Sequence, residues 1–122
     1  MSFLSRFFGR PSKPRTASKD EVSFDETGVK RIMRDGRTEF ISWDELQEVV
    51  IITTDRGPWV DDVYYVLSGT DRGCAVPSEA VGMQALVPRL QALPGFKNEA
   101  AIQAMGSTRN ATFLCWSREN AL

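Results

Sequence analysis

Short runs of alternating apolar and polar residues cover most of the chain between residues 21 and 116. Alternation with a period of two is typical of β-strands that present one face to a core. The strands predicted from it are Glu21–Phe24, Val29–Arg34, Arg37–Ile41, Glu48–Thr54, Asp62–Ser68, Cys74–Val76 and Ala111–Trp116. A two-residue Asp-Gly hairpin signal joins the second of these strands to the third. The pattern therefore predicts an antiparallel sheet.

The stretch Glu39–Thr54, EFISWDELQEVVIITT, is the part around which the others are arranged. Ser42 is followed three residues later by Glu45, which matches a capping box. We therefore expect one helical turn from Trp43 to Leu46, with both of these side chains directed into the core. The β-branched run VVIITT that follows is typical of a central strand.

The strand predicted at Val29–Arg34 does not alternate cleanly, so we expect it to be an edge strand or a strongly twisted one. Gly28 precedes it and is expected to supply the positive φ of a turn. The hairpin around it carries the four cations Lys30, Arg31, Arg34 and Arg37. One interpretation is a contact for an anion such as phosphate or for an acidic peptide. The other is protection of a sheet edge by solvated charge.

Two helices are predicted after the sixth strand. Ser78 is expected to cap a helix that runs to Leu93 and packs on the sheet. Asn98 is expected to cap a second, shorter helix that Gly106 ends. With the last strand, these elements place a single α+β domain at residues 21–116, and residues 117–122 are expected to fray.

The first ten residues, MSFLSRFFGR, are amphipathic at helical spacing. At about 100° per residue the four large apolar side chains fall on one arc, and Arg10 lies at its border. The opposite side carries Ser2, Ser5, Arg6 and Gly9. So short a helix needs a surface, which can be an anionic membrane, a protein partner or its own domain. The candidate contact residues are Phe3, Leu4, Arg6, Phe7, Phe8 and Arg10. A linker rich in Pro, Ser and Lys completes the basic tail, residues 1–20.

Composition and charge narrow the class of protein. The chain of 122 residues is 42% hydrophobic and 25% charged, as in a globular domain rather than a disordered chain. Its net charge of −1 gives no reason to expect nucleic-acid binding. Cys74 and Cys115 are far apart and are expected to be buried, which favours the reducing cytoplasm. No apolar run approaches the length of a membrane-spanning helix.

The residues offer little catalytic chemistry. The chain contains no histidine, which removes the commonest general base and metal ligand. Asp61 and Asp62 are adjacent, so on a strand they point to opposite faces. No glycine-rich phosphate loop is present. We therefore predict no catalytic site, cofactor or metal. Trp59 is the best candidate for an exposed aromatic contact on a loop rim, and the alternative is a core plug under the sheet.

The segment VSFDETGVKRI…RTEFISWDELQEV resembles bacterial pleckstrin-homology-like (PH-like) domains, in which a "D-x-x-G-V/I" turn and an "I-S-W-x-E/D-I/L" corner recur. The resemblance covers roughly residues 22–77. It implies a strongly bent antiparallel sheet or partly open barrel with a C-terminal helix packed on it. Asn98–Trp116 departs from this pattern by adding a short helix and a strand. The resemblance also implies a binding scaffold rather than a catalyst.

Three functions follow from these features. The first is a non-enzymatic cytoplasmic module that binds a protein or peptide along a sheet edge or a loop rim. The second is a membrane-associated adaptor, held at the inner surface by the basic tail. The third is a toxin-immunity-type inhibitor, whose acidic body covers a basic site. The sequence leaves the partner's identity open and allows a homo-oligomer.

Overall fold

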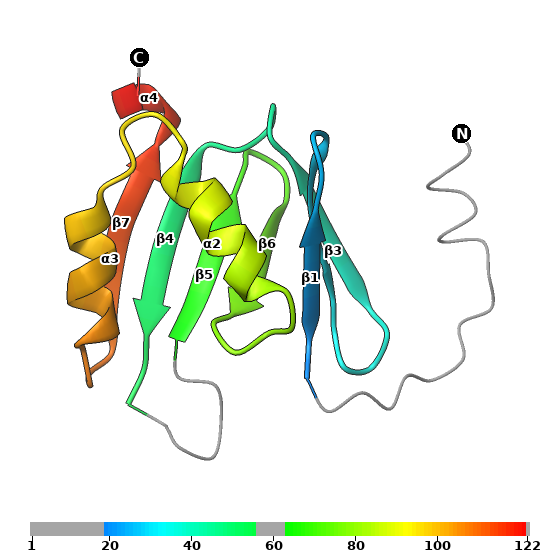
Figure 1. Ribbon diagram of the computed structural model, residues 1–122, viewed down its shortest axis with the longest axis horizontal. Coiled ribbons are helices and arrows are strands. Elements are labelled where there is room, and N and C mark those ends of the chain that lie inside the picture. Colours follow the sequence, from blue (N-terminus) through cyan, green and yellow to red (C-terminus); the bar gives the residue numbers. More distant parts are fainter. Residues whose placement is uncertain (1–18, 56–62, 122) are drawn as a thin grey trace.

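The computed structural model describes residues 19–55 and 63–121. These residues form an α+β fold of seven β-strands and three short helices (Figure 1). The strands are β1 (Glu21–Phe24), β2 (Gly28–Ile32), β3 (Thr38–Ser42), β4 (Glu48–Thr53), β5 (Val63–Ser68), β6 (Gly73–Pro77) and β7 (Ala111–Ser117). The helices are α2 (Met83–Gln91), α3 (Asn98–Met105) and α4 (Arg118–Ala121). All seven predicted strands are present, with boundaries shifted by a few residues.

The strands form two antiparallel sheets. A three-stranded sheet has the order β1-β2-β3, and a four-stranded sheet has the order β6-β5-β4-β7. The strands therefore form two sheets rather than the single bent sheet that was one of the two expectations, and the sheets do not close into a barrel. They meet at β3 and β6, where the N–H of Ala75 donates to Glu39 Oε1 at 3.0 Å. Figure 1 shows α2 crossing in front of the four-stranded sheet and α3 beside β7.

The core contains side chains from both sheets and from α2. Its most deeply buried members are Val29, Ile41, Leu46, Val49, Ile51, Leu67, Cys74, Val76, Leu86, Leu90 and Cys115. We call the side of each sheet that carries these residues its inner face. Burial alternates along β4 and β5, as the sequence predicts. β4 lies between β5 and β7, which confirms it as a central strand. Both cysteines are buried, as expected.

The capping box after β3 is confirmed by two reciprocal hydrogen bonds. The N–H of Glu45 donates to Ser42 Oγ at 3.1 Å, and the N–H of Ser42 donates to Glu45 Oε1 at 3.0 Å. The segment forms a hydrogen-bonded turn rather than a helix. Leu46 is buried as expected. Trp43 packs only at the margin of the core, because its indole N–H donates to the Asp25 carbonyl oxygen at 2.7 Å.

Two expectations about the first hairpin are corrected. β2 is the central strand of the three-stranded sheet, which overturns the edge-strand alternative and leaves the twisted strand as a prediction. Gly28 does not have a positive φ. Glycine is needed there for space, because a Cβ atom would collide with the carbonyl oxygen of Ile41 and the Cα of Ser42 on β3. The predicted hairpin between β2 and β3 is present, with Gly36 at a φ of 94°.

The helix predicted from Ser78 begins later. The N–H of Ser78 donates to the Val63 carbonyl oxygen at 2.9 Å, so this residue continues the sheet instead of capping a helix. The chain then runs beside β1, where the N–H of Val22 donates to the Val81 carbonyl oxygen at 2.8 Å. α2 begins only after Gly82, whose φ of 101° turns the chain away from β1. Tertiary pairing with β1 therefore overrides the local capping signal.

The C-terminal part differs in two details. Asn98 is the first residue of α3 rather than its cap, whereas Gly106 ends the helix as predicted, in a right-handed conformation. Residues 118–121 form α4 instead of fraying. Arg118 holds this end in place, because its Nε donates to the Leu46 carbonyl oxygen at 2.8 Å.

Candidate functional site

The side of the four-stranded sheet that faces away from the core carries two rows of paired side chains. The rows are Leu114–Val50–Val66–Ala75 and Thr112–Ile52–Tyr64, and neighbours in each row are direct partners on adjacent strands. The residues that alternate with them, such as Ile51 and Leu67, are buried on the inner face. We call these seven residues the outer face.

The outer face contains no charged residue. Among the outward positions of the four strands only Glu48, at the start of β4, carries a charge. Leu114 is 37% exposed, although it is a large apolar side chain. Antiparallel sheets with one solvated side usually carry polar residues there. A contiguous apolar surface on such a side is therefore a candidate interaction site.

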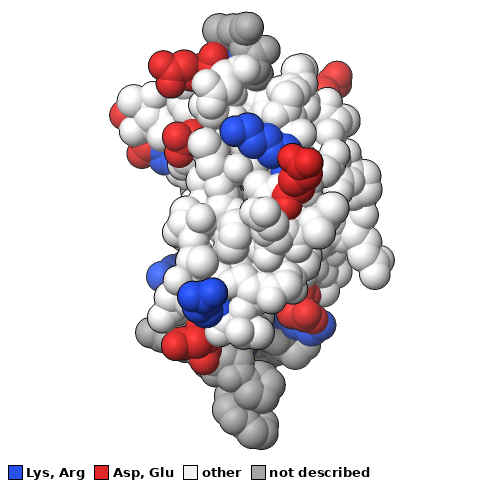
Figure 2. All heavy atoms as spheres, turned by 90° about the vertical axis from the view of Figure 1, so that its left-hand side faces the viewer, with Lys and Arg blue, Asp and Glu red and all other residues white. Residues whose placement is uncertain are grey.

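Exposed apolar side chains also occur on α3, which packs beside β7. Ile102 is 71% exposed and Met105 is 53% exposed. Figure 2 views the molecule from the side of α3 and β7. The middle of this view shows no charged side chains, and blue and red atoms gather toward its upper and lower parts. The side of the molecule formed by α3 and β7 therefore also presents uncharged surface.

The sheet edges offer less room for a partner strand. β1 is paired along its edge with Val81. β3 and β6 are bridged by the hydrogen bond from Ala75 to Glu39. On β7 the Cys115 carbonyl oxygen accepts a hydrogen bond from the Lys97 N–H at 2.7 Å. A broad contact surface is therefore better provided by the outer face than by an edge.

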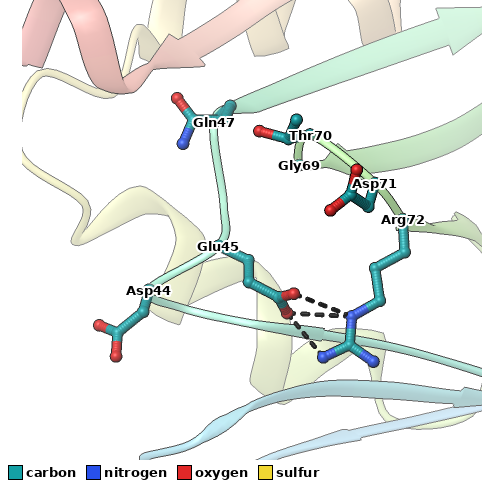
Figure 3. Close-up of a pocket in the computed structure, with 7 residues that line it drawn as sticks. All are labelled: Asp44, Glu45, Gln47, Gly69, Thr70, Asp71 and Arg72. Atoms are coloured by element: carbon teal, nitrogen blue, oxygen red, sulfur yellow. Dashed lines mark hydrogen bonds and ion pairs between the residues drawn. The ribbon is translucent and has the colours of Figure 1, made fainter.

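A polar hollow of about 260 Å³ lies between the β3–β4 and β5–β6 connections (Figure 3). Its lining residues are Asp44, Glu45, Gln47, Gly69, Thr70, Asp71 and Arg72. Figure 3 shows the Arg72 guanidinium turned onto the Glu45 carboxylate, and their closest approach is 2.8 Å. Hydrogen bonds from Arg72 and from the Ser42 N–H lower the pKa of Glu45 to about 2. This carboxylate is therefore ionised at neutral pH and is poorly suited to proton transfer.

The predicted basic cluster is divided between ion pairs. Arg31 points to the inner side of β2, where its Nη2 lies 2.6 Å from Asp20 Oδ2 and its Nη1 lies 3.0 Å from Glu39 Oε1. The side chains of Arg31 and Asp20 are only 15% and 8% exposed. Burial lowers the pKa of Arg31, but the hydrogen bonds and charges of Asp20 and Glu39 outweigh it and raise the pKa. Arg31 therefore links Asp20 and Glu39 at the edge of the core and has a structural role.

The other cations of this cluster lie in different environments. Arg34 Nε lies 3.9 Å from Asp20 Oδ1, and Arg37 Nε lies 2.7 Å from Asp35 Oδ2. Lys30 occupies an outward position on β2, beside Phe40 of β3. The structure therefore does not bring the four cations together around one point, and the anion or peptide contact stays a prediction.

Several predicted contacts lie outside the described residues. They are Phe3, Leu4, Arg6, Phe7, Phe8 and Arg10 of the tail, and Trp59 of the loop. The adjacent pair Asp61 and Asp62, for which no site is predicted, also lies outside them. Within residues 19–55 and 63–121, no group of three or more potential metal ligands is found. None of the helices in this part of the chain has the length and apolar character needed to cross a bilayer.

The two thiols are poor nucleophiles. Burial raises the pKa of Cys74 to about 12, and burial also raises the pKa of Cys115. Both are therefore protonated at neutral pH, which makes them slow to react.

Comparison with known proteins gives no further guide. No family model matches this sequence, and searches of curated proteins and of solved structures found no match. The resemblance to PH-like domains therefore rests on its motif alone. The outer face was not predicted from the sequence as a contact surface. Its signal is the run VVII at residues 49–52, in which both the inward and the outward positions of β4 are apolar.

Proposed function

We propose that this protein is a non-enzymatic, cytoplasmic protein-binding module whose contact surface is the outer face. The observation that carries the proposal is the absence of charge from all seven outer-face residues, on a sheet side that faces away from the core. Covering such a surface with a partner would release water from apolar side chains, at about 25 cal/mol per Å². A charged partner surface would gain nothing there, so the partner should present an apolar surface of its own.

The chemistry of the described residues is consistent with binding rather than catalysis. The sequence has no histidine, and the two thiols are buried with raised pKa values. The polar hollow beside β4 contains a carboxylate, Glu45, that its arginine partner keeps ionised. The resemblance to PH-like domains supports the same proposal, because it implies a binding scaffold.

Single lysine substitutions test this proposal. Leu114→Lys and Thr112→Lys place a charge on exposed positions of the outer face. Ser23→Lys is the matched control, because Ser23 is an exposed residue of β1 on the three-stranded sheet. The full chain and each variant would be used to capture proteins from a native lysate, with identification by mass spectrometry.

The expected result is a stoichiometric partner that the wild type and Ser23→Lys retain and both outer-face variants lose. A partner retained equally by all three variants would place the contact elsewhere and contradict the proposal. Circular dichroism and thermal unfolding would confirm that each variant is folded before capture is compared.

A further inference from the structure

Two features of this chain are complementary: an uncharged sheet face and an amphipathic segment. The surface is the outer face. The segment is Met1–Arg10, which lies outside the described residues and whose sequence predicts an amphipathic helix. We propose that the side chains of Phe3, Leu4, Phe7 and Phe8 pack on the outer face of their own chain, so that a partner must displace them. This inference rests on the proposed function, since it names an occupant for the same face.

The described chain begins close to the four-stranded sheet. The N–H of Val81 donates to the Asp20 carbonyl oxygen at 2.9 Å, and Lys19 Nζ lies 3.8 Å from Glu79 Oε1. Three residues before Val81, the N–H of Ser78 donates to the Val63 carbonyl oxygen at 2.9 Å. Three residues span at most about 11 Å. The attachment point of the tail is therefore near the end of β5 that begins at Val63.

The linker and the segment have suitable lengths. Residues 11–18 can span up to about 28 Å when extended, which is enough to pass around the end of the sheet. A ten-residue helix is about 15 Å long. Three spacings of about 4.8 Å separate the two outermost strands of the four-stranded sheet, so the sheet is about 14 Å wide. The helix predicted for Met1–Arg10 therefore matches the width of the surface.

Charge also favours this arrangement. The predicted helix carries Arg6 on its polar side and Arg10 at its border. Glu48 is the charged residue at the margin of the outer face, and it is exposed. In the proposed arrangement the apolar side of the segment would meet no charge on the outer face, and its arginines would be attracted to Glu48.

Cross-linking in the full chain tests the contact. A Ser5→Cys/Thr112→Cys variant pairs the predicted helix with an exposed outer-face position, and Ser5→Cys/Ser23→Cys is the matched control. Ser23 is closer to the tail in sequence but lies on the other sheet. The native cysteines are buried, so a short bis-maleimide reagent would react with the introduced thiols first. The protein would be kept dilute, and cyclised monomer would be separated from cross-linked dimer by gel electrophoresis.

The expected result is cyclisation of the Thr112 pair about ten-fold faster than that of the Ser23 pair, because docking raises the effective concentration above that of a free tether. Adding Phe7→Asp should remove this difference. Equal rates for the two pairs would overturn the proposal. Cross-linked dimer in place of cyclised monomer would also overturn it and would identify a second copy as the occupant.

Failure of this inference can be told apart from failure of the proposed function. If the tail docks on the outer face, Phe7→Asp should increase partner capture by the full chain, since it removes a competitor. If cyclisation shows no preference but Leu114→Lys still abolishes capture, the binding face stands and only its occupation by the tail is wrong.

Discussion

The two sheets of this small domain treat charge in opposite ways. The three-stranded sheet has charged residues on both sides: Arg31 and Glu39 point inward with Asp20 beside them, and Glu21 and Lys30 occupy outward positions. The outer face of the four-stranded sheet has none, and its inner face is almost wholly apolar.

The difference indicates where each sheet finds its partners. Buried charges must be paired within the molecule, because an isolated charge is costly to remove from water. Arg31 therefore binds its acids internally and is not available to a ligand. Apolar residues on an outward side can instead be covered by another surface, as we propose for the outer face. If this comparison is correct, substitutions in the three-stranded sheet should affect stability, and substitutions on the outer face should affect binding.

The largest loss of stability is expected from Arg31→Met. This change leaves the Asp20 and Glu39 carboxylates close together without their shared cation. Breaking a buried ion pair on one side costs about 3 kcal/mol or more. Urea denaturation would measure the free energy of unfolding. The control is Arg37→Met, which removes an exposed pair on the same hairpin and should cost less than about 1 kcal/mol. Equal losses for the two variants would contradict the claim that the Arg31 ion pairs stabilise the fold more than the exposed Arg37 pair.

A smaller loss is expected from Gly28→Ala. The added methyl group would collide with the β3 backbone at Ile41 and Ser42, and overpacking of this kind costs about 2 kcal/mol. Gly106→Ala is the control, since its nearest neighbour would lie 3.8 Å away and its backbone is right-handed. That change should be neutral or stabilise by about 0.5 kcal/mol. Thermal unfolding of both variants measures the difference, and a neutral Gly28→Ala would show that the two strands can separate without cost.

The Glu45–Arg72 pair predicts a dependence of stability on pH. The pKa of Glu45 is about 2 in the folded protein against an ordinary value of 4.5. A lowered pKa means that the carboxylate stabilises the fold fully above pH 4.5, and that this contribution is lost as the pH falls toward 2. The free energy of unfolding of Glu45→Gln should therefore fall less than that of the wild type as the pH drops from 4.5 to 2. Asp44→Asn leaves the pair intact and should retain the wild-type loss; identical pH profiles for all three proteins would contradict the assignment.

The smallest effect on stability is expected from Leu114→Lys. Its side chain is exposed, and surface substitutions usually change the free energy of unfolding by less than about 0.5 kcal/mol. Urea denaturation beside the wild type would check this. A loss of several kcal/mol would mean that Leu114 supports the fold of β7. Weaker binding by this variant would then report unfolding rather than a lost contact.

The sequence predicted the strands well because their apolar alternation reflects burial on the inner faces. The capping box at Ser42 was also predicted, because it depends on residues three positions apart. The start of α2 was not, because Ser78 is held by Val63 and the chain beyond it pairs with β1. The role of Gly28 was missed for a similar reason: the space it leaves is set by β3, and no local pattern reports that distance.

The candidate site was harder to predict than the fold. The charged residues of the first hairpin were predicted as a contact site, yet Arg31 forms ion pairs with Asp20 and Glu39 in the structure. No contact role was predicted for Val50 and Val66, because an apolar residue in a strand is ordinarily assigned to the core. Only the register across β5, β4 and β7 shows that these residues share a side with Leu114 and face away from the core.

The central claim, that the outer face is the binding surface, is tested most directly by the dissociation constants of the captured partner. Isothermal titration calorimetry would compare the wild type, Leu114→Lys and Ser23→Lys at equal salt concentration. We predict that Leu114→Lys weakens binding by at least about ten-fold, or 1.4 kcal/mol, because an ammonium group must lose its water at an apolar contact. Ser23→Lys should stay within about two-fold of the wild type, an effect under about 0.5 kcal/mol. Equal weakening by both variants, or by neither, would contradict the account.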